Sequence, residues 1–189
     1  MKEKALQGKT IVVGVTGCIA VYKACDVVNW LRQAGASVKV IMTKNACEFV
    51  GPLTFETLSQ NPVVTDMFAD KKTWEVEHIS LARGADLLLV APATYNLINK
   101  VVGGIADDML STVIAATPAP IVFAPAMNDG MWANPILQDN IKKLETYGKY
   151  SFIAPKTSML ACGYVGTGAL AKPADIVDYV VKFLSSEEA

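Results

Sequence analysis

Apolar runs of strand length alternate with segments of helical periodicity along most of the chain. The first run, residues 10–16, is almost continuously apolar and is followed by glycine, as expected of a strand buried on both faces. Runs of the same kind predict four further strands, at residues 37–43, 86–91, 120–124 and 150–154.

Apolar residues at helical spacing lie between these runs. After the first run they are Ala20, Ala24, Val27, Val28 and Leu31, and Gly35 is predicted to end that helix as its C-terminal cap. Further helices are predicted around residues 96–100, 108–116, 135–148 and 173–184. This alternation implies parallel strands joined by right-handed crossovers, and therefore a three-layer α/β/α, Rossmann-like fold. In such a sheet the ligand lies beyond the carboxyl ends of the strands.

The composition favours one domain that binds small molecules or protein. The chain has 189 residues, 52% of them hydrophobic and 19% charged, which suits a single domain over residues 1–189 with its core at about 9–184. Its 17 basic and 18 acidic residues leave a net charge of −1, so no strong field attracts nucleic acid or an anionic membrane.

The sequence features that report on compartment favour the cytoplasm. No apolar segment reaches the roughly 18 residues of a membrane span, and no signal-peptide cleavage pattern is evident. The four cysteines form no C-x-x-C pair, which favours reduced thiols, and a single histidine argues against a zinc site.

A glycine-containing loop, Gly14 to Lys23, follows the first strand. Such a turn into a helix presents backbone N–H groups to a phosphate. It matches neither the P-loop nor G-x-G-x-x-G, and the second strand ends in Met42 and Thr43 without the acidic residue that holds the ribose of NAD. A mononucleotide therefore fits better than NAD. The alternative is a tight turn without a ligand.

Polar residues also follow the third and fourth strands. Thr94 and Asn96 can bind a phosphate or a heterocycle edge, or Thr94 can simply cap the next helix. In VFAPAMNDGMWANP, Asn128 offers an amide, and Met131 and its neighbours offer apolar surface to a flat ring or to another subunit. The alternative for that stretch is a buried loop whose Met and Trp side chains fill space in the protein interior.

Two further residues are candidates for chemistry. Cys162 lies in a glycine-containing segment, residues 155–170, which has no clear periodicity and resembles a functional loop. It can act as an acid or nucleophile, or be inert. His78 is the only imidazole and so the candidate base at neutral pH, or else a solvent-facing helix residue. For Cys18, Cys25 and Cys47 a place in the core is predicted.

Four motifs together resemble the flavin-dependent cysteine decarboxylases, over residues 9–184. They are Gly14 to Lys23 (G-x-x-G-x-I-A-x-Y-K), Pro92 to Leu97, Pro125 to Trp132 (P-A-M-N-x-x-M-W), and Ala161-Cys162-Gly163 followed by Gly166-Thr167-Gly168. The chain departs from the family at Cys18, where many members have Gly or Ser, and at Tyr95, which replaces a small residue.

The resemblance implies FMN as cofactor and assigns roles to particular residues. His78, Asn128 and Cys162 would be catalytic, and Asn128, Met131, Ala161 and Cys162 would bind the substrate. The FMN-binding residues would be Thr16, Gly17, Cys18, Ile19, Thr43, Thr94, Tyr95, Asn96, Leu97 and Ala126.

The reaction implied by the resemblance is the FMN-dependent decarboxylation of 4′-phosphopantothenoylcysteine to 4′-phosphopantetheine in coenzyme A biosynthesis. Oxidation of the thiol carbon to a thioaldehyde would create the electron sink that loss of CO₂ needs, and an enethiol would follow. Reduction of the enethiol, with a proton from Cys162, would complete the reaction.

The family leaves other activities and assemblies open. Alternatives are a peptidyl-cysteine oxidative decarboxylase of the lantibiotic type and a non-catalytic flavin-binding regulatory subunit; a prenyl-flavin synthase is disfavoured by the intact motifs at Asn128 and Cys162. The resemblance also implies a homotrimer or homododecamer, with His78 and Asn128 meeting from different subunits. A separate synthetase would supply the substrate.

Overall fold

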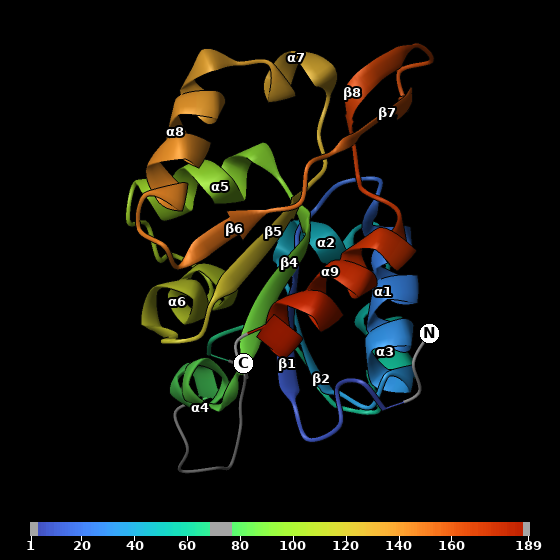
Figure 1. Ribbon diagram of the computed structural model, residues 1–189, viewed down its shortest axis with the longest axis vertical. Helices are drawn as coiled ribbons and strands as arrows, with labels where there is room; N and C mark the ends of the chain where they lie inside the picture. The colour runs from blue at the N-terminus through green and yellow to red at the C-terminus, as the bar shows by residue number, and fades with distance from the viewer. Residues whose placement is uncertain (1–3, 69–76, 187–189) are drawn as a thin grey trace.

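A six-stranded parallel sheet forms the centre of the protein, and it confirms the predicted fold class (Figure 1). The computed structural model describes residues 4–68 and 77–186. The order across the sheet is β3-β2-β1-β4-β5-β6, and every neighbouring pair is parallel. The strands are β1 (Thr10–Val15), β2 (Ser37–Met42), β3 (Val63–Val64), β4 (Leu87–Ala93), β5 (Ile121–Pro125) and β6 (Tyr150–Phe152).

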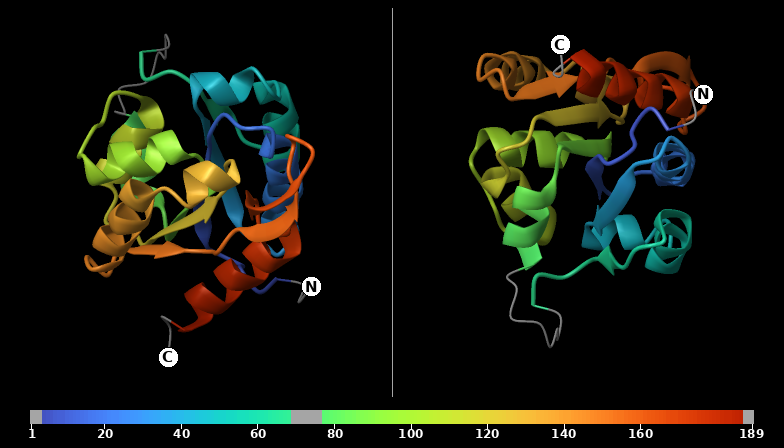
Figure 2. Two further views of the ribbon diagram at one scale, coloured as in Figure 1. Left: turned by 90° about the horizontal axis from the view of Figure 1, so that it is seen from above. Right: turned by 60° about the horizontal axis from the view of Figure 1, so that its bottom comes forward.

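Helices cover both faces of this sheet (Figure 2). On one face pack α1 (Val21–Gln33), α2 (Lys44–Cys47), α3 (Pro52–Ser59) and α9 (Pro173–Ser186). On the other face pack α4 (Glu77–Gly84), α5 (Tyr95–Val102), α6 (Met109–Ala116) and α8 (Pro135–Glu145). Short α7 (Asp129–Trp132) follows β5 directly.

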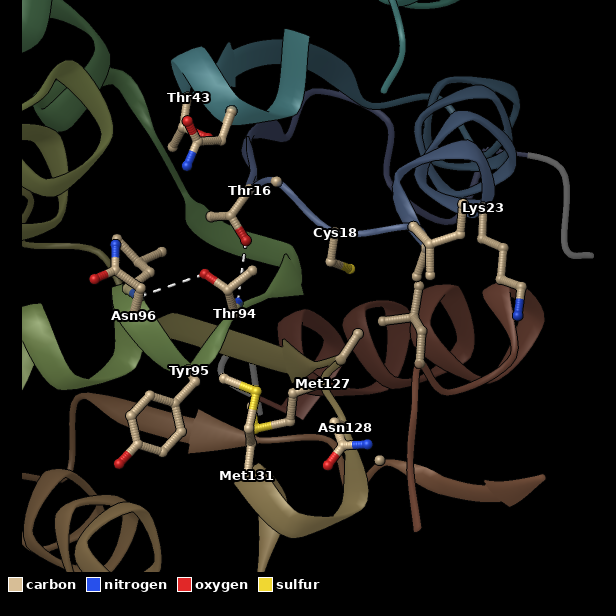
Figure 3. Close-up of a pocket in the computed structure, with 18 of the residues that line it drawn as sticks. Thr16, Cys18, Lys23, Thr43, Thr94, Tyr95, Asn96, Met127, Asn128 and Met131 are labelled. Carbon is tan, nitrogen blue, oxygen red and sulfur yellow. Dashed lines mark hydrogen bonds between the residues drawn. The ribbon is translucent and has the colours of Figure 1, made fainter. Parts of the chain in front are cut away.

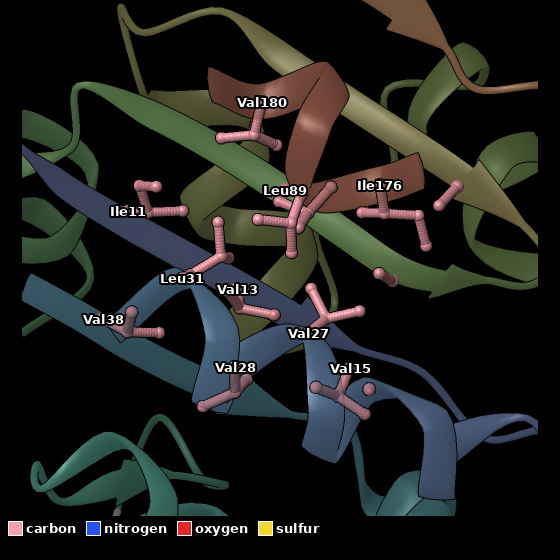
Figure 4. Packing of buried hydrophobic residues seen from close by; sticks show 14 of the residues in the cluster. Ile11, Val13, Val15, Val27, Val28, Leu31, Val38, Leu89, Ile176 and Val180 are labelled. Atoms are coloured by element: carbon pink, nitrogen blue, oxygen red, sulfur yellow. The ribbon is translucent and has the colours of Figure 1, made fainter. Parts of the chain in front are cut away.

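The alternation of side chains along each strand divides the core into two layers. In β1, Val13 packs toward α1 and α9, whereas Val12 packs toward α6. In β4, Leu89 belongs to the first layer and Leu88 to the second, and all four of these side chains are fully buried. Figure 4 shows Val13 and Leu89 in the first layer. A strand with apolar contacts on both faces has no polar position, which is why the sequence of these strands is continuously apolar.

Helix ends follow the local chemistry of the sequence. After α1, Gly35 has φ of 100°, a left-handed conformation that suits glycine, so its predicted capping position is confirmed. Asp108 begins α6 with a capping box, in which its carboxylate accepts the Ser111 N–H at 2.8 Å. The predicted helix from residue 135 ends earlier than expected, at Glu145.

The largest difference from the sequence expectation lies in residues 155–170. This segment is a two-stranded antiparallel hairpin, β7 (Lys156–Met159) and β8 (Val165–Ala169), rather than a loop without regular structure. The hairpin lies outside the main sheet, and much of it is exposed to solvent. Because it has no fully buried face and contains three glycines within six residues, it lacks the apolar alternation by which a strand is recognised.

The segment from Lys44 to Val64 holds elements that the sequence pattern did not predict. These are α2, α3 and the two-residue strand β3 at the edge of the sheet. α2 and β3 are too short to give a clear periodic signal, and α3 buries only Phe55 and Ser59, so it lacks an apolar stripe. Within the described residues, every helix is too short or too polar to cross a lipid bilayer.

Truncation of Leu89 tests this packing scheme. Leu89→Ala removes a fully buried side chain from the centre of the sheet, so the free energy of unfolding should fall by about 2–5 kcal/mol. Leu53→Ala, in which a 73% exposed side chain on α3 is removed, is the matched control and should change it by less than about 0.5 kcal/mol. Urea unfolding followed by circular dichroism measures both, and equal losses would contradict the assignment of the core.

Candidate active site

A cavity of about 930 Å³ opens at the carboxyl ends of β1, β2, β4 and β5 (Figure 3). Its walls come from the loops after these strands and from the tip of the β7–β8 hairpin. All but one of the predicted site residues line it, namely Thr16, Gly17, Cys18, Ile19, Thr43, Thr94, Tyr95, Asn96, Leu97, Ala126, Asn128, Met131, Ala161 and Cys162. The exception is His78.

The buried hydroxyl of Thr16 joins the ends of β1 and β4. Its Oγ1 donates a hydrogen bond to the Pro92 carbonyl at 2.7 Å and accepts one from the Thr94 N–H at 3.1 Å. Only 2% of Thr16 is exposed, so these bonds form largely out of water, where an unpaired carbonyl or N–H group is costly. The hydroxyl thus fixes two loops of the cavity relative to each other.

Gly17 allows the loops after β1 and β2 to touch. A Cβ atom at this position would lie 2.5 Å from Cβ of Asn45 and 2.7 Å from the Asn45 carbonyl carbon. Asn45 lies in α2, which Thr43 begins by accepting the Ala46 N–H on its side chain at 3.3 Å. The glycine is therefore required by close packing, and it leaves backbone exposed to the cavity.

Thr94 fulfils the simpler of its two predicted roles and also lies in the cavity wall. Its Oγ1 accepts the Leu97 N–H at 3.4 Å, as the N-cap of α5. Asn96, one residue into that helix turn, is exposed to the cavity. The first turn of α5 therefore places polar groups opposite the apolar side chains of Met127 and Met131 (Figure 3).

Asn128 has a fixed orientation above the cavity. Its Oδ1 accepts the Gly130 N–H at 2.9 Å, which makes Asn128 the N-cap of α7. The opposite end of the amide, Nδ2, donates to Tyr164 Oη at 3.2 Å and lies 3.8 Å from Cys162 Sγ. A donor amide and an exposed thiol are thus neighbours at the same part of the cavity.

The β7–β8 hairpin is attached to the segment after β5 by backbone contact. The Met127 N–H donates to the Gly168 carbonyl at 2.9 Å, and a Cβ on Gly168 would overlap the Met127 carbonyl oxygen. A Cβ on Gly166 would lie 3.0 Å from Asp129 Cβ. Tyr164 adds a side-chain bond, from its hydroxyl to Asp129 Oδ1 at 2.7 Å. Glycine in β8 therefore permits the approach that brings Cys162 over the cavity.

The remaining cysteines pack partly against the core, as predicted. Burial raises the pKa of the Cys18, Cys25 and Cys47 thiols, so all three are neutral at pH 7. Cys18 also lines the cavity, where it presents a neutral and weakly polar surface.

Charged side chains that the motifs did not single out also line the cavity. Lys44 follows β2, and Lys100 on α5 pairs with Asp107 at 2.7 Å and with Asp108 at 3.8 Å. The Lys100 ammonium lowers the pKa of the Asp107 carboxyl, chiefly through their hydrogen bond. Because the start of α6 meets α5 only in the folded chain, sequence spacing gave no sign that Asp108 borders this cavity.

His78 lies away from the cavity within one chain. It is half-buried near the start of α4, and no residue of α4 is among those that line the cavity in the described part of the chain. In the same described residues, no group of three or more His, Cys, Asp or Glu side chains is placed to hold a metal ion.

The family model described as Flavoprotein matches residues 1–185, and the chain belongs to this family. It is 46% identical to a probable phosphopantothenoylcysteine decarboxylase of Streptococcus mutans, over 86% of this chain and 92% of that protein. It is 49% identical to the coenzyme A biosynthesis bifunctional protein CoaBC of Bacillus subtilis, over 96% of this chain. The match covers 45% of the Bacillus protein, so the chain spans about half the length of such bifunctional relatives.

Solved structures support the same family relationship. A PPC decarboxylase variant in complex with pantothenoylaminoethenethiol is 30% identical, with a TM-score of 0.85 over 94% of this chain and 98% of that one. The FMN-dependent cysteine decarboxylase SpaF is 29% identical, with a TM-score of 0.82 over 95% and 99%. The predicted resemblance to the flavin-dependent cysteine decarboxylases, and with it the expectation of a flavoprotein, is confirmed.

Replacement of the Thr16 hydroxyl tests the connection between β1 and β4. Thr16→Val keeps the shape but leaves the Pro92 carbonyl and the Thr94 N–H without their partner, so the free energy of unfolding should fall by about 1–3 kcal/mol. Thr57→Val is the control, because Thr57 bonds the Leu53 carbonyl on an exposed helix where water can replace it. Denaturant unfolding compares the two variants, and an undiminished stability in Thr16→Val would refute the role of this hydroxyl.

Proposed function

We propose that the chain is an FMN-dependent decarboxylase of 4′-phosphopantothenoylcysteine that forms 4′-phosphopantetheine in coenzyme A biosynthesis. The observation that carries the proposal is the position of Asn128 and Cys162. Their side chains lie within 3.8 Å of each other beside a cavity that Thr16, Thr94 and Met127 also line. The relatives named as phosphopantothenoylcysteine decarboxylase or CoaBC support the choice of substrate.

The cavity suits FMN in size and in chemistry. About 930 Å³ is of the order that a cofactor of this size requires. Ile19, Met127 and Met131 offer apolar surface for a flat ring, and the exposed backbone beside Gly17 with the start of α5 offers polar groups for the ribityl chain and phosphate. When bound, FMN supplies the two-electron oxidation of the substrate's thiol carbon and the later return of those electrons.

The residues around the cavity then have distinct tasks. A carboxylate beside CH₂SH has no electron sink, so CO₂ leaves only after that carbon is a thioaldehyde, and an enethiol results. Asn128 Nδ2 donates to the substrate carboxylate and holds it, and Ala161 and Met131 border the bound substrate. Cys162 supplies the proton that accompanies reduction of the enethiol. A PPC decarboxylase in which a cysteine is replaced by serine was solved with pantothenoylaminoethenethiol, an enethiol, which supports this order.

The base, His78, comes from a neighbouring subunit in this proposal. Since α4 contributes nothing to the cavity of its own chain, a trimer or a dodecamer built of trimers would bring the imidazole of one subunit to Asn128 of the next. Exposed apolar side chains, among them Met131, are available for such contacts. A separate phosphopantothenoylcysteine synthetase would provide the substrate. The cytoplasmic location stays a prediction.

A single-cuvette experiment tests the proposal. The purified protein, reconstituted with FMN, should show a flavin absorption spectrum, and anaerobic addition of 4′-phosphopantothenoylcysteine should release CO₂ and end with oxidised flavin and 4′-phosphopantetheine. Protein that binds FMN but acts only on peptides with a C-terminal cysteine would instead support the peptidyl-cysteine alternative. Flavin binding without turnover of either substrate would support the regulatory alternative, and absence of FMN binding would refute the proposal.

Replacement of Cys162 should separate the two halves of the reaction. Cys162→Ser should still release CO₂ but stop at the enethiol with reduced flavin, because a hydroxyl is a far weaker acid than a thiol. Mass spectrometry identifies the enethiol as a product two hydrogen atoms lighter than 4′-phosphopantetheine. Cys25→Ser, on α1 outside the cavity lining, is the matched control and should form normal product. Normal product at the wild-type rate from Cys162→Ser would remove this thiol from the mechanism.

A charge at position 128 should prevent substrate binding. In Asn128→Asp two carboxylates would face each other, which at about 4 Å and an effective dielectric constant of about 20 costs roughly 4 kcal/mol, so kcat/KM should fall at least about 100-fold. Asn134→Asp is the control. Asn134 also caps a helix, α8, and aspartate caps as well as asparagine does, so loss of the cap is excluded as the cause. Steady-state kinetics measure kcat/KM of both variants. Equal values for Asn128→Asp and Asn134→Asp would count against the role of Asn128.

A further inference from the structure

Tyr164, at the tip of the β7–β8 hairpin, forms a hydrogen-bonded chain with two consecutive residues of the opposite wall. Its hydroxyl lies 2.7 Å from Asp129 Oδ1 and 3.2 Å from Asn128 Nδ2. Cys162, two residues earlier on the same turn, lies 3.8 Å from the same amide nitrogen. The turn itself is held by backbone bonds between Leu160 and Tyr164 and between Gly163 and Leu160.

The direction of each bond in this chain is determined by the groups present. Asp129 as a carboxylate can only accept, so the single proton of the Tyr164 hydroxyl points toward it. The hydroxyl then has only lone pairs to offer Asn128, whose Nδ2 is a donor. The orientation of that amide is set from the other end, because Oδ1 accepts the Gly130 N–H at 2.9 Å. The hydrogen bond to Asp129 is the largest effect that raises the pKa of Tyr164, so the phenol keeps its proton at neutral pH.

Of the two N–H groups of the Asn128 amide, one is firmly engaged and the other is not. The bond to Tyr164 has ordinary length, whereas the contact with Cys162 Sγ at 3.8 Å is that of a weak acceptor. An incoming carboxylate therefore competes with the thiol rather than with the phenol.

From this geometry we infer that Tyr164 is a positioning residue for carboxylate recognition, because it holds one Asn128 N–H and directs the other at the substrate carboxylate. The inference rests on the proposed function. Tyr164 would take no part in the reaction itself. Through Tyr164, the hairpin tip would help to select substrates that carry a carboxylate beside the thiol carbon.

The experiment compares ligands with and without the carboxylate on FMN-loaded protein. For Tyr164→Phe, the dissociation constant of 4′-phosphopantothenoylserine, an unreactive ligand with a hydroxyl in place of the thiol, should rise about 5- to 10-fold, the effect of one lost hydrogen bond. That of 4′-phosphopantetheine, which has no carboxylate, should change less than about 2-fold. Perturbation of the flavin absorption reports both constants, and KM for the substrate should rise with little change in kcat.

One further variant makes the comparison specific. Tyr147→Phe, an exposed tyrosine on a turn after α8 that lies outside the cavity lining, is the matched control and should bind both ligands normally.

The outcomes separate this inference from the proposed function. If Tyr164→Phe raised the dissociation constants of both ligands equally, Tyr164 would have only a structural role in the hairpin. If it changed neither constant, Tyr164 would have no role in recognition. Either result overturns the inference while leaving wild-type turnover intact. Wild-type protein that fails to decarboxylate 4′-phosphopantothenoylcysteine would overturn the proposed function and this inference together. Circular dichroism of each variant checks that it is folded.

Discussion

The Thr16 hydroxyl spans the point at which the strand order of the sheet reverses. From β1 the chain builds outward through β2 to β3 on one side, and through β4 to β6 on the other, so the loops after β1 and β4 diverge and leave a crevice between them. The bonds from Thr16 to Pro92 and Thr94 cross this crevice at its floor. The loop after β1 contacts the segment after β2 at Gly17 and Asn45, and the Ala126 N–H after β5 donates to the Ala93 carbonyl at the end of β4. A shift of the loops after β1 and β4 against each other would therefore change the shape of the site.

Much of the fold could be predicted because its central strands are buried on both faces. Such strands have no polar positions, so their apolar runs stand out, and Gly35 or Asp108 mark helix ends by conformational and capping chemistry that is local. The hairpin could not be predicted in the same way. It is joined to the rest of the fold by contacts with Met127 and Asp129, which are remote in sequence, and Gly166 and Gly168 are explained by close approach to those residues rather than by strand propensity.

The candidate site was predictable to the extent that it consists of segments directly after strands. Thr16, Thr94 and Asn128 each follow an apolar run, and parallel strands bring such positions to one edge of a sheet. Asn45 and Tyr164 gave no signal, because their part in the site depends on which loops touch. His78 marks another limit: the sequence identified it as the one available imidazole, whereas its distance from the cavity is a property of the folded chain.

The hairpin differs from the rest of the cavity wall in how it is joined to the core. The loops after β1, β4 and β5 continue buried strands, so their geometry is bound to that of the sheet, whereas β7 and β8 form an appendage between β6 and α9 with its own small sheet. Residues at its tip can therefore be exchanged during evolution at little cost to folding. Diversification of substrate within one cofactor-binding scaffold is expected to concentrate there, where a change alters recognition and leaves the core untouched.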